Sequence, residues 1–580
     1  MSIKNCLGAV VALALFTLCA CSNSMSIQED PSDKEVISQA IIKTTAEGAV
    51  VTNNEGTVDI SNEEVVDTIN IEPAIEPNTA EKTESKSETT EPVEETEVTD
   101  SIDLEIEPIK PALLSFSFPK KANKLSHDIS CNIRENDLLE CFPKESLNSN
   151  LLTASFEFEG DSITLADGKN FPLETNALDY SKAVSLTVHS GDQKRIYEVH
   201  LYPYTGFPYI SVETDNGMAI DKSSLKGAQI RVMEDPDIQK LGSSKKCSII
   251  GHGNSTWEKP KKPYLLKFDD KTSLLSLPKG KSWVMIANYF DKTMIRNSMA
   301  MYLSSLSNAS FTPQFQYFEL ILNGQYKGTY QLFEKVTVSK KRVNIGDKDY
   351  LLEVDNHPRA KDTYFSLDNL PKPIKIHEPQ VSEGDKDYNY IKETMEHIEA
   401  VLFSDNFLDE TDGYKKYIDI DALVEWFVVT EITETPSNRV NWYMTYERNG
   451  KLKMGPFWDY DLAFGNSLWT PYANEIERIW MSYLAWFKQF LKDLEFKKKT
   501  AERFNYFYSK KADILSKADE YAEKVKYSVV PNEREWGTLE CDSCSAEKIH
   551  ELYDQELSKM KTWLDARMEW LSIKFNEMAN

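Results

Sequence analysis

Apolar and polar residues alternate over short runs in the region between residues 109 and 204. Residues 114–118, 154–158, 184–188 and 196–201 each place apolar side chains at every second position. Alternation with a period of two is typical of half-buried strands, and turn residues at intervals of about 8–12 positions are typical of a β-sandwich. The pattern predicts a small all-β sandwich over residues 109–204.

The pattern changes after residue 204. Strand-like runs occupy residues 228–232, 264–268, 318–322 and 328–333, and Asn323-Gly324 between the last two is a strong signal for a hairpin. Residues 419–433, and much of the chain from residue 476 to the end, place apolar side chains at helical spacing. We therefore expect one large α+β domain over residues 205–580, with a strand-rich first half and a helical second half.

The beginning of the chain has the pattern of an export signal. Lys4 is followed by an apolar run from Leu7 to Leu18, which suits a signal-peptide core, whereas a membrane-spanning helix needs about 20 residues. The run ends in a sequence that resembles the bacterial lipobox, Leu18-Cys19-Ala20-Cys21. In that motif the cysteine thiol takes a diacylglycerol as a thioether before cleavage.

We therefore expect a lipoprotein signal peptide over residues 1–20 and a lipid on Cys21. The protein would be exported and anchored to the cell membrane or outer membrane, facing the periplasm or the cell exterior. An ordinary cleaved signal and a single transmembrane anchor are the alternatives.

Composition supports a tether after Cys21. Residues 21–108 are rich in Glu, Asp, Thr and Ser, and they carry much of the formal net charge of −27. Such a segment cannot bury enough apolar surface to fold, so we expect a disordered acidic linker, with binding of a basic partner as the alternative. The overall charge argues against a nucleic-acid partner, which requires a basic face.

Cysteine usage agrees with an oxidising compartment. There we expect two disulfides, Cys131–Cys141 and Cys541–Cys544. A zinc site at the second pair is the weaker alternative, because it needs two more ligands and only His550 is close. Cys247 lies in an apolar strand-like run, which predicts a buried thiol.

Four stretches combine glycine, charge and aromatic residues in a way that a plain core would not: residues 251–268, 288–297, 323–334 and 455–466. A Gly-x-Gly turn beside a strand with lysines, as in the first, can bring N–H groups and ammonium charges onto phosphates. Taken alone this signal is weak, since glycines in hairpins and lysines on strand faces are common. The second stretch alone predicts only a capped helix start with a surface arginine. The third stretch alone predicts a glutamate that pairs with a lysine or faces solvent.

The fourth stretch holds two acidic residues at i and i+2. If it forms a strand, Asp459 and Asp461 face the same side and can present two carboxylates to a hard cation such as Mg²⁺. If it forms a turn, the two side chains need not converge, and a structural capping role is the alternative.

In this order the four stretches resemble the CotH kinase family. The shared features are Gly-Asn-Ser-Thr-Trp with Lys-Lys-Pro-Tyr, then Ile-Arg-Asn, then Leu-Asn-Gly-x-Tyr-x-Gly-x-Tyr, and last Gly-Pro-x-Trp-Asp-Tyr-Asp-x-Ala-Phe-Gly. The resemblance runs from about residue 206 to the C-terminal helices. It implies an atypical protein-kinase-like fold and an exported protein kinase that uses ATP and Mg²⁺ or Mn²⁺. The preceding sandwich resembles the immunoglobulin-like modules found before catalytic domains in exported bacterial proteins, with a spacing or docking role.

Carried onto this sequence, the resemblance implies a set of site residues. Asp459 corresponds to the metal-binding aspartate, with Asp461 as its helper. Lys262 and Lys267 are the candidate phosphate-contacting lysines, and Glu334 is a candidate partner for one of them. Arg296 is a candidate phosphate clamp, and Asn254 is a further cofactor-binding candidate.

One expected part is altered. Family members often carry Asn-x-Asp before the Trp-Asp motif, and that aspartate is the expected base for the substrate hydroxyl. Here Ser437 lies about where the aspartate is expected, and serine cannot accept a proton at neutral pH. Glu434, one helical turn away, is a candidate substitute.

Two main hypotheses follow. The first is an enzyme that transfers the γ-phosphoryl group of ATP to hydroxyls of an envelope or surface protein. The second is an inactive kinase-like protein that binds or scaffolds envelope partners, which the altered base and the scarcity of ATP outside the cytosol favour. A third hypothesis, an exported hydrolase or carbohydrate-binding protein, has only the richness in aromatic residues behind it.

Overall fold

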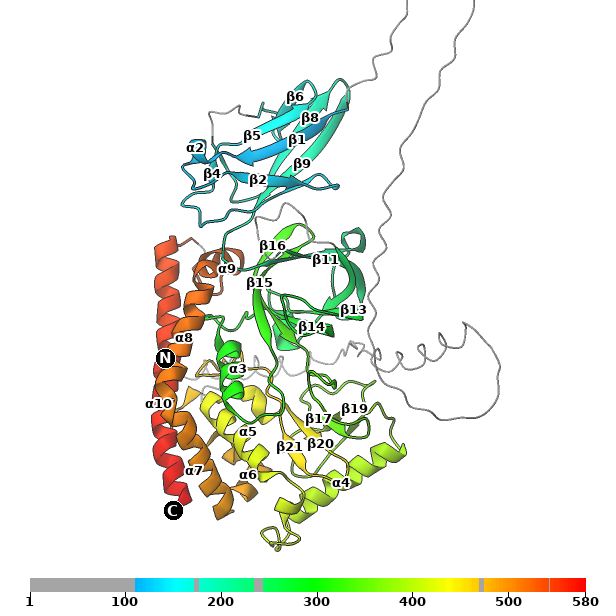
Figure 1. Cartoon of the computed structure of the whole chain (residues 1–580), viewed down its shortest axis with the longest axis vertical. Helices are drawn as coiled ribbons and strands as arrows, with labels where there is room; N and C mark the ends of the chain where they lie inside the picture. The colour runs from blue at the N-terminus through cyan, green and yellow to red at the C-terminus, as the bar shows by residue number, and fades with distance from the viewer. Residues whose placement is uncertain (1–109, 172–176, 234–243, 469–473, 542) are drawn as a thin grey trace, which may run out of the picture. The chain divides into compact units, whose positions relative to one another are not determined.

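The computed structural model describes residues 110–171, 177–233, 244–468, 474–541 and 543–580 (Figure 1). The predicted signal peptide, the lipid site at Cys21 and the acidic linker lie outside these residues. Within the described part of the chain, no helix is both long enough and apolar enough to cross a bilayer.

The first described region is built from strands, as the alternating pattern predicts. Its elements are β1 (Ala112–Phe118), α2 (Lys120–Asn123), β2 (Ile129–Ile133), β3 (Leu138–Cys141), β4 (Leu151–Leu152), β5 (Ser155–Glu159), β6 (Ser162–Leu165), β7 (Leu178–Asp179), β8 (Val184–Ser190) and β9 (Gln193–Leu201). Seven of them form one sheet in the order β5-β1-β2-β3-β9-β8-β6, and β4 pairs with β7. Alternate residues such as Phe116, Phe118, Leu186 and Val188 are buried, and a disulfide joins Cys131 to Cys141 across β2 and β3.

The next seven strands close into a barrel. They are β10 (Tyr209–Thr214), β11 (Lys226–Met233), β12 (Lys245–Gly251), β13 (Tyr264–Thr272), β14 (Gly280–Ile286), β15 (Phe315–Leu322) and β16 (Gln325–Glu334). The order around the barrel is β10-β11-β12-β13-β14-β16-β15, and the parallel pairing of β10 with β15 closes it. Asn323 and Gly324 both have positive φ angles at the β15–β16 hairpin, which is the turn chemistry that the sequence signal requires. Cys247 is a buried free thiol in β12.

A second sheet and the helices form the rest of the large domain. The strands are β17 (Tyr350–Val354), β18 (Tyr364–Phe365), β19 (Ile374–Glu378), β20 (Trp442–Tyr446) and β21 (Leu452–Met454), in the order β18-β19-β17-β20-β21. The longer helices are α3 (Arg296–Leu306), α4 (Lys386–Leu402), α5 (Ile420–Thr433), α6 (Ala485–Phe490), α7 (Leu494–Ser509), α8 (Lys511–Val525), α9 (Val529–Trp536) and α10 (Ala546–Ala579). The second disulfide, Cys541–Cys544, lies between α9 and α10.

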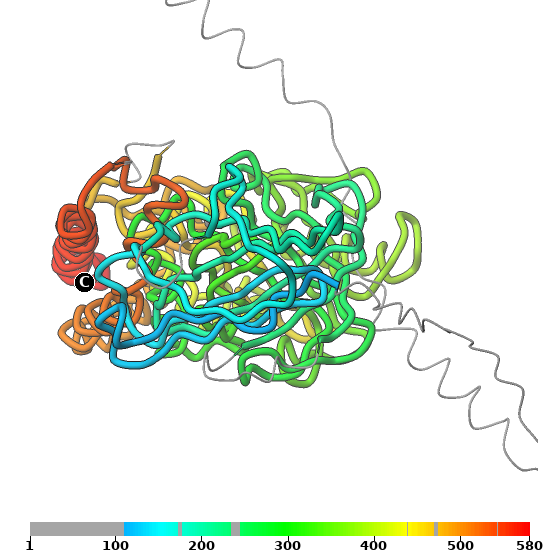
Figure 2. Tube along the Cα trace, turned by 90° about the horizontal axis from the view of Figure 1, so that it is seen from above, coloured from blue at the N-terminus to red at the C-terminus, as the bar shows by residue number. Residues whose placement is uncertain are grey.

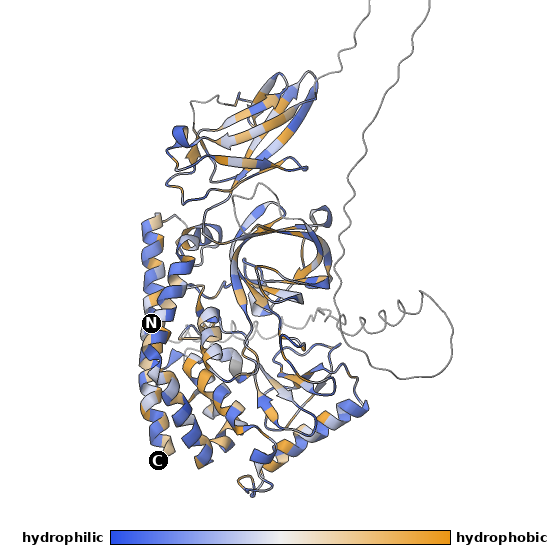
Figure 3. Cartoon of the chain, in the orientation of Figure 1, coloured by the Kyte–Doolittle hydropathy of each residue, from blue (hydrophilic) through white to orange (hydrophobic). Residues whose placement is uncertain are grey.

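Helix α5 is the central helix of this region. The side chain of Asp419 accepts hydrogen bonds from the backbone N–H groups of Asp421 and Ala422, which caps the helix start. Every residue from Leu423 to Thr433 is buried, and a helix that is buried on all sides belongs to a core. Hydrophobic positions dominate this helix in Figure 3, and Figures 1 and 2 show α10 alongside the preceding helices.

A fully buried arginine joins α10 to the end of α5. Arg567 forms ion pairs with Glu431 at 3.0 Å and with Glu434 at 3.2 Å, and its Nε donates to the carbonyl oxygen of Glu431. The Glu431 carboxylate also accepts the backbone N–H groups of Trp480 and Met481. One guanidinium therefore serves two buried carboxyl groups.

We expect the free energy of unfolding to fall as pH rises from about 5 to about 8. Burial raises the pKa of Glu431 from 4.5 to about 7 and the pKa of Glu434 from 4.5 to about 8. Between the unfolded and folded pKa values the folded state holds more protons, so raising the pH favours unfolding, by up to about 1.4 kcal/mol per pH unit for each group. Thermal denaturation across this range measures the slope. In Glu434→Gln the side chain at this position cannot ionise, so the free energy of unfolding should depend less steeply on pH. An unchanged pH dependence in that variant would contradict the raised pKa of Glu434.

Candidate functional site

A pocket of about 330 Å³ lies where several loops of the large domain meet. Its walls are residues 252–256, the end of β14 with residues 287–290, residues 353–359, parts of β19, the short helix η4 (Pro436–Arg439) and residues 458–462. Ligand pockets in proteins have volumes of about 300–1,000 Å³, so this pocket has room for a small molecule.

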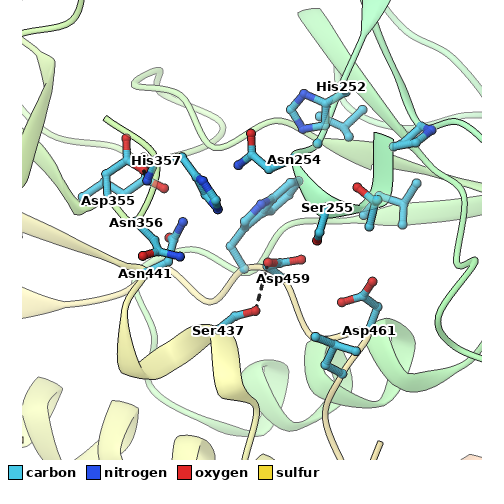
Figure 4. A pocket seen from close by; sticks show the side chains of 18 of the residues that line it. His252, Asn254, Ser255, Asp355, Asn356, His357, Ser437, Asn441, Asp459 and Asp461 are labelled. Atoms are coloured by element: carbon cyan, nitrogen blue, oxygen red, sulfur yellow. Dashed lines mark hydrogen bonds between the residues drawn. The ribbon is translucent and has the colours of Figure 1, made fainter. Parts of the chain in front are cut away.

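Asp459 and Asp461 both line this pocket (Figure 4). The segment that carries them is not a strand, so the geometry that would place i and i+2 on one face does not apply. Asp459 has a φ of +70°, a left-handed conformation that aspartate tolerates better than most residues. Its carboxylate is exposed to the pocket and accepts a 3.1 Å hydrogen bond from the hydroxyl of Ser437, while Asp461 is buried. The two side chains nevertheless line the same pocket.

The two carboxyl groups are difficult to ionise together. Although the Asp459 side chain is open to solvent at the pocket, the protein packed around the pocket desolvates its carboxylate and raises its pKa. The hydrogen bond from Ser437 opposes this shift, and the charge of Glu353 adds to it. Desolvation also raises the pKa of Asp461 well above its usual value, with further contributions from Asp459 and Asp291. A bound cation would relieve this repulsion.

The donor set is suited to Mg²⁺. Among the described residues, no cluster of three or more His, Cys, Asp or Glu side chains forms a cage for a metal ion. Mg²⁺ is usually held by only one or two carboxylates, with waters and substrate phosphates as its other ligands. Asp459 and Asp461, which line one pocket, are two such carboxylates.

The glycine-rich turn of the first motif lies on another wall of the pocket. A side chain at Gly251 would place its Cβ 2.5 Å from the ring of Trp257, and one at Gly253 would place it 2.1 Å from the Thr256 hydroxyl. Gly253 also has a φ of +75°. These glycines let the backbone turn tightly, so that Asn254 and Ser255 reach the pocket (Figure 4).

Positive charge gathers on the glycine-turn side. Lys335 and Arg359 line the pocket, and Lys222 donates a 2.6 Å hydrogen bond to the carbonyl oxygen of Gly253. Burial lowers the pKa of His252 to about 3, and the charges of Lys335, Arg359 and Lys222 add to the effect. Three cationic side chains therefore lie near the neutral His252, and Asp459 and Asp461 line another part of the same pocket.

Of the predicted site residues, Asn254, Asp459 and Asp461 line the pocket, as does Ser437. Lys262, Lys267, Glu334 and Arg296 are not among its lining residues. Lys262 donates to the carbonyl oxygen of Trp257 and lies 5.2 Å above that residue's ring, and Lys267 is buried in β13.

Glu334 and Arg296 have buried partners of their own. Glu334 lies 3.5 Å from Arg342 and accepts the backbone N–H of Gln314. The guanidinium of Arg296 pairs with Asp291 and donates to the carbonyl oxygen of Ala463 at 3.0 Å.

The proposed substitute base is also outside the pocket lining. Glu434 is fully buried after α5, and its carboxyl group pairs with Arg567 at 3.2 Å.

Sequence reasoning missed several pocket residues from the second sheet. These are Glu353, Asp355 and His357 in and after β17, and Lys375 and His377 in β19. His377 Nε2 hydrogen-bonds Glu353 Oε2, and Lys375 pairs with Asp362 at 2.9 Å. Polar residues two apart in apolar strands were the available signal, but only the pairing of β17 with β19 brings the two sets together.

Comparison with known proteins identifies the family. A family model described as CotH kinase protein matches residues 249–571. A crystal structure of a DUF4623 family protein from Bacteroides eggerthii is similar over 24% of this chain and about a third (35%) of that chain, at 10% identity and a TM-score of 0.13, a level that carries no argument. No curated protein matches this sequence.

Proposed function

Because the chain belongs to the CotH kinase protein family, we propose that its pocket binds ATP with Mg²⁺ or Mn²⁺ and transfers the γ-phosphoryl group to Ser or Thr hydroxyls of envelope or surface proteins. The observation that carries this proposal is the arrangement of one pocket, with two carboxylates on one side and a glycine turn with cations on another. Phosphoryl transfer depends mostly on positioning and charge neutralisation, for which this arrangement supplies the parts.

Each side of the pocket has a role in the proposal. Asp459 and Asp461 hold the metal ion, which supplies neutralisation of the charge on the phosphates. The N–H groups of the glycine turn, with Lys335 and Arg359, bind phosphate oxygens. In this proposal the barrel and the helical part act as the two lobes of a kinase-like fold, and residues 109–204 form an immunoglobulin-like spacer.

A second candidate function is favoured by Ser437. Ser437 stands in the sequence about where the family's aspartate is expected, and its hydroxyl donates to the carboxylate of Asp459. Asp355 is another carboxylate of the pocket, but it accepts hydrogen bonds from the Tyr364 hydroxyl at 2.8 Å and the His357 N–H at 2.7 Å. A kinase-like protein that binds nucleotide and scaffolds envelope partners without turnover is consistent with these contacts.

Incubation of the purified chain with labelled ATP, Mg²⁺ or Mn²⁺, and casein separates the two candidates. Phosphate on casein or on the chain itself supports the enzyme. Nucleotide binding without transfer, under both metals, supports the scaffold and rejects the enzyme.

Ser437→Asp is expected to raise the rate of phosphoryl transfer by about 10²-fold or more, because a positioned general base contributes about 10²–10⁴-fold. The new carboxylate oxygens would lie one bond further from the backbone than the Ser437 hydroxyl, on the Asp459 side of the pocket. Initial rates with casein, compared with wild type and with Ser437→Asn, measure the effect. The asparagine variant has similar size without the base, so an equal gain in both variants would contradict the explanation.

The anchoring proposal has its own test. Export and a lipid on Cys21 would place the domain on a membrane, with the acidic segment 21–108 as a tether that reaches partners away from the surface. Expression in a bacterial host with labelled fatty acid should label the wild-type chain and leave Cys21→Ser unlabelled. Equal labelling of both chains would reject the assignment.

A further inference from the structure

We propose that Asn297 is a positioning residue that sets the separation of the Asp459 and Asp461 carboxylates. This inference deepens the proposed function and rests on the metal-binding role of those two aspartates. Asn297 lies in the first turn of α3 and is 3% exposed. Its Oδ1 accepts the backbone N–H of Tyr460 at 2.9 Å.

The hydrogen bond from Tyr460 to Asn297 lies between the two aspartates of the pocket. Tyr460 is the residue between the two aspartates, so the bond fixes the peptide that connects them. The segment belongs to neither a sheet nor a helix, and Asp459 is held in a left-handed conformation. A buried peptide N–H outside regular structure needs an acceptor from elsewhere in the fold, and here the side chain of Asn297 supplies it.

Arg296 holds a second point of the same loop. Its Nε donates to the carbonyl oxygen of Ala463, and its guanidinium is itself fixed by Asp291 and Thr293. Two consecutive residues of α3 thus bind the loop on either side of Asp461. This accounts for the Ile-Arg-Asn motif without a contact between Arg296 and a phosphate.

A directional chain of amides orients Asn297. Gln331 of β16 donates its Nε2 to the hydroxyl of Ser298 at 2.7 Å, so its Oε1 is left to accept from Asn288 Nδ2 at 3.0 Å. Asn288 Oδ1 in turn accepts from Asn297 Nδ2 at 3.3 Å. Each amide has one acceptor end and one donor end, so this chain points Oδ1 of Asn297 at Tyr460. The barrel thereby specifies the geometry of the acidic loop.

Amide hydrogen exchange of the full-length protein tests the inference without any metal. Asn297→Ala should speed exchange at the Tyr460 amide by about tenfold, the effect of losing one buried hydrogen bond. Ser304→Ala is the matched control: it removes a buried hydroxyl of α3 that hydrogen-bonds the Thr312 hydroxyl at 2.7 Å, and neither residue belongs to the amide chain that orients Asn297. Wild-type exchange at Tyr460 in Asn297→Ala, or equal acceleration in both variants, would overturn the proposal.

Titration with Mn²⁺, followed by electron paramagnetic resonance, gives the second readout. Asn297→Ala should weaken Mn²⁺ binding by about tenfold or more, and Ser304→Ala should bind as wild type does. Wild-type affinity in Asn297→Ala would overturn the proposal. A wild-type protein that binds no Mn²⁺ would refute the metal role of Asp459 and Asp461, while faster exchange at Tyr460 would still support Asn297 as the residue that fixes the loop.

Discussion

Asp459→Asn is expected to lower phosphoryl transfer by about 10²–10³-fold or more, which is the scale on which one group that stabilises transition-state charge acts. The substitution keeps the size of the side chain and keeps an oxygen that can accept the Ser437 hydrogen bond. It removes one of the two negative charges on which binding of a divalent cation depends. The loss should therefore appear in catalysis and in metal affinity, and barely in stability.

Initial rates with labelled ATP and a Mn²⁺ titration measure these two effects on the same preparation. Asp270→Asn is the control, because Asp270 is an exposed aspartate in β13 that does not line the pocket. Wild-type transfer by Asp459→Asn would show that the site is wrongly placed. A loss in both variants would indicate a general effect of lowering the negative charge.

Arg567→Met is expected to destabilise the folded protein by about 3–5 kcal/mol, the range found when one member of a buried ion pair is removed. Glu431 and Glu434 would stay buried with no guanidinium beside them, and the carbonyl oxygens of Glu431 and Arg478 would each lose a donor. Since α5 leads directly into the turn that carries Ser437, the pocket should loosen as well. Chemical denaturation, monitored by tryptophan fluorescence, measures the loss.

A surface pair on the same helix provides the comparison. Lys561 of α10 pairs with Asp519 at 2.6 Å, and Lys561→Met should cost no more than about 1 kcal/mol because the pair is partly exposed to solvent. Combining Arg567→Met with Glu431→Gln and Glu434→Gln should recover part of the stability, since no buried charge is left unpaired. Equal losses in Arg567→Met and Lys561→Met would contradict the buried-pair account.

The sequence predicts the individual helices and strands of this fold better than it predicts how the strands close into a barrel. Asp419 before an apolar helical run, and Asn323-Gly324 between two strands, are local signals, and both act in the structure as their chemistry requires. The barrel depends on the parallel pairing of β10 with β15, which are separated by about a hundred residues. No periodicity within either strand specifies that partner.

Three of the candidate site residues that were taken from the motifs line the pocket in the structure. Asp459, Asp461 and Asn254 lie at the pocket, and Ser437 lies beside Asp459 where the family's aspartate is expected. Lys262 and Lys267 are not among the lining residues: Lys262, just before β13, donates to the carbonyl oxygen of Trp257, and Lys267 is buried within β13. The phosphate-clamp role of Arg296 stays a prediction, and its motif alone does not specify its contacts with Asp291 and Ala463, which the fold brings to it.

The central claim is that Asp459 and Asp461 form the metal end of a nucleotide pocket. A crystal structure of the protein soaked with ADP and Mg²⁺ tests it most directly. We expect a Mg²⁺ ion at about 2.0–2.1 Å from a carboxylate oxygen of Asp459, Asp461 or both, with the diphosphate extending toward the glycine turn and Arg359. Nucleotide bound elsewhere, or bound in this pocket with its metal ion on other residues, would contradict the claim.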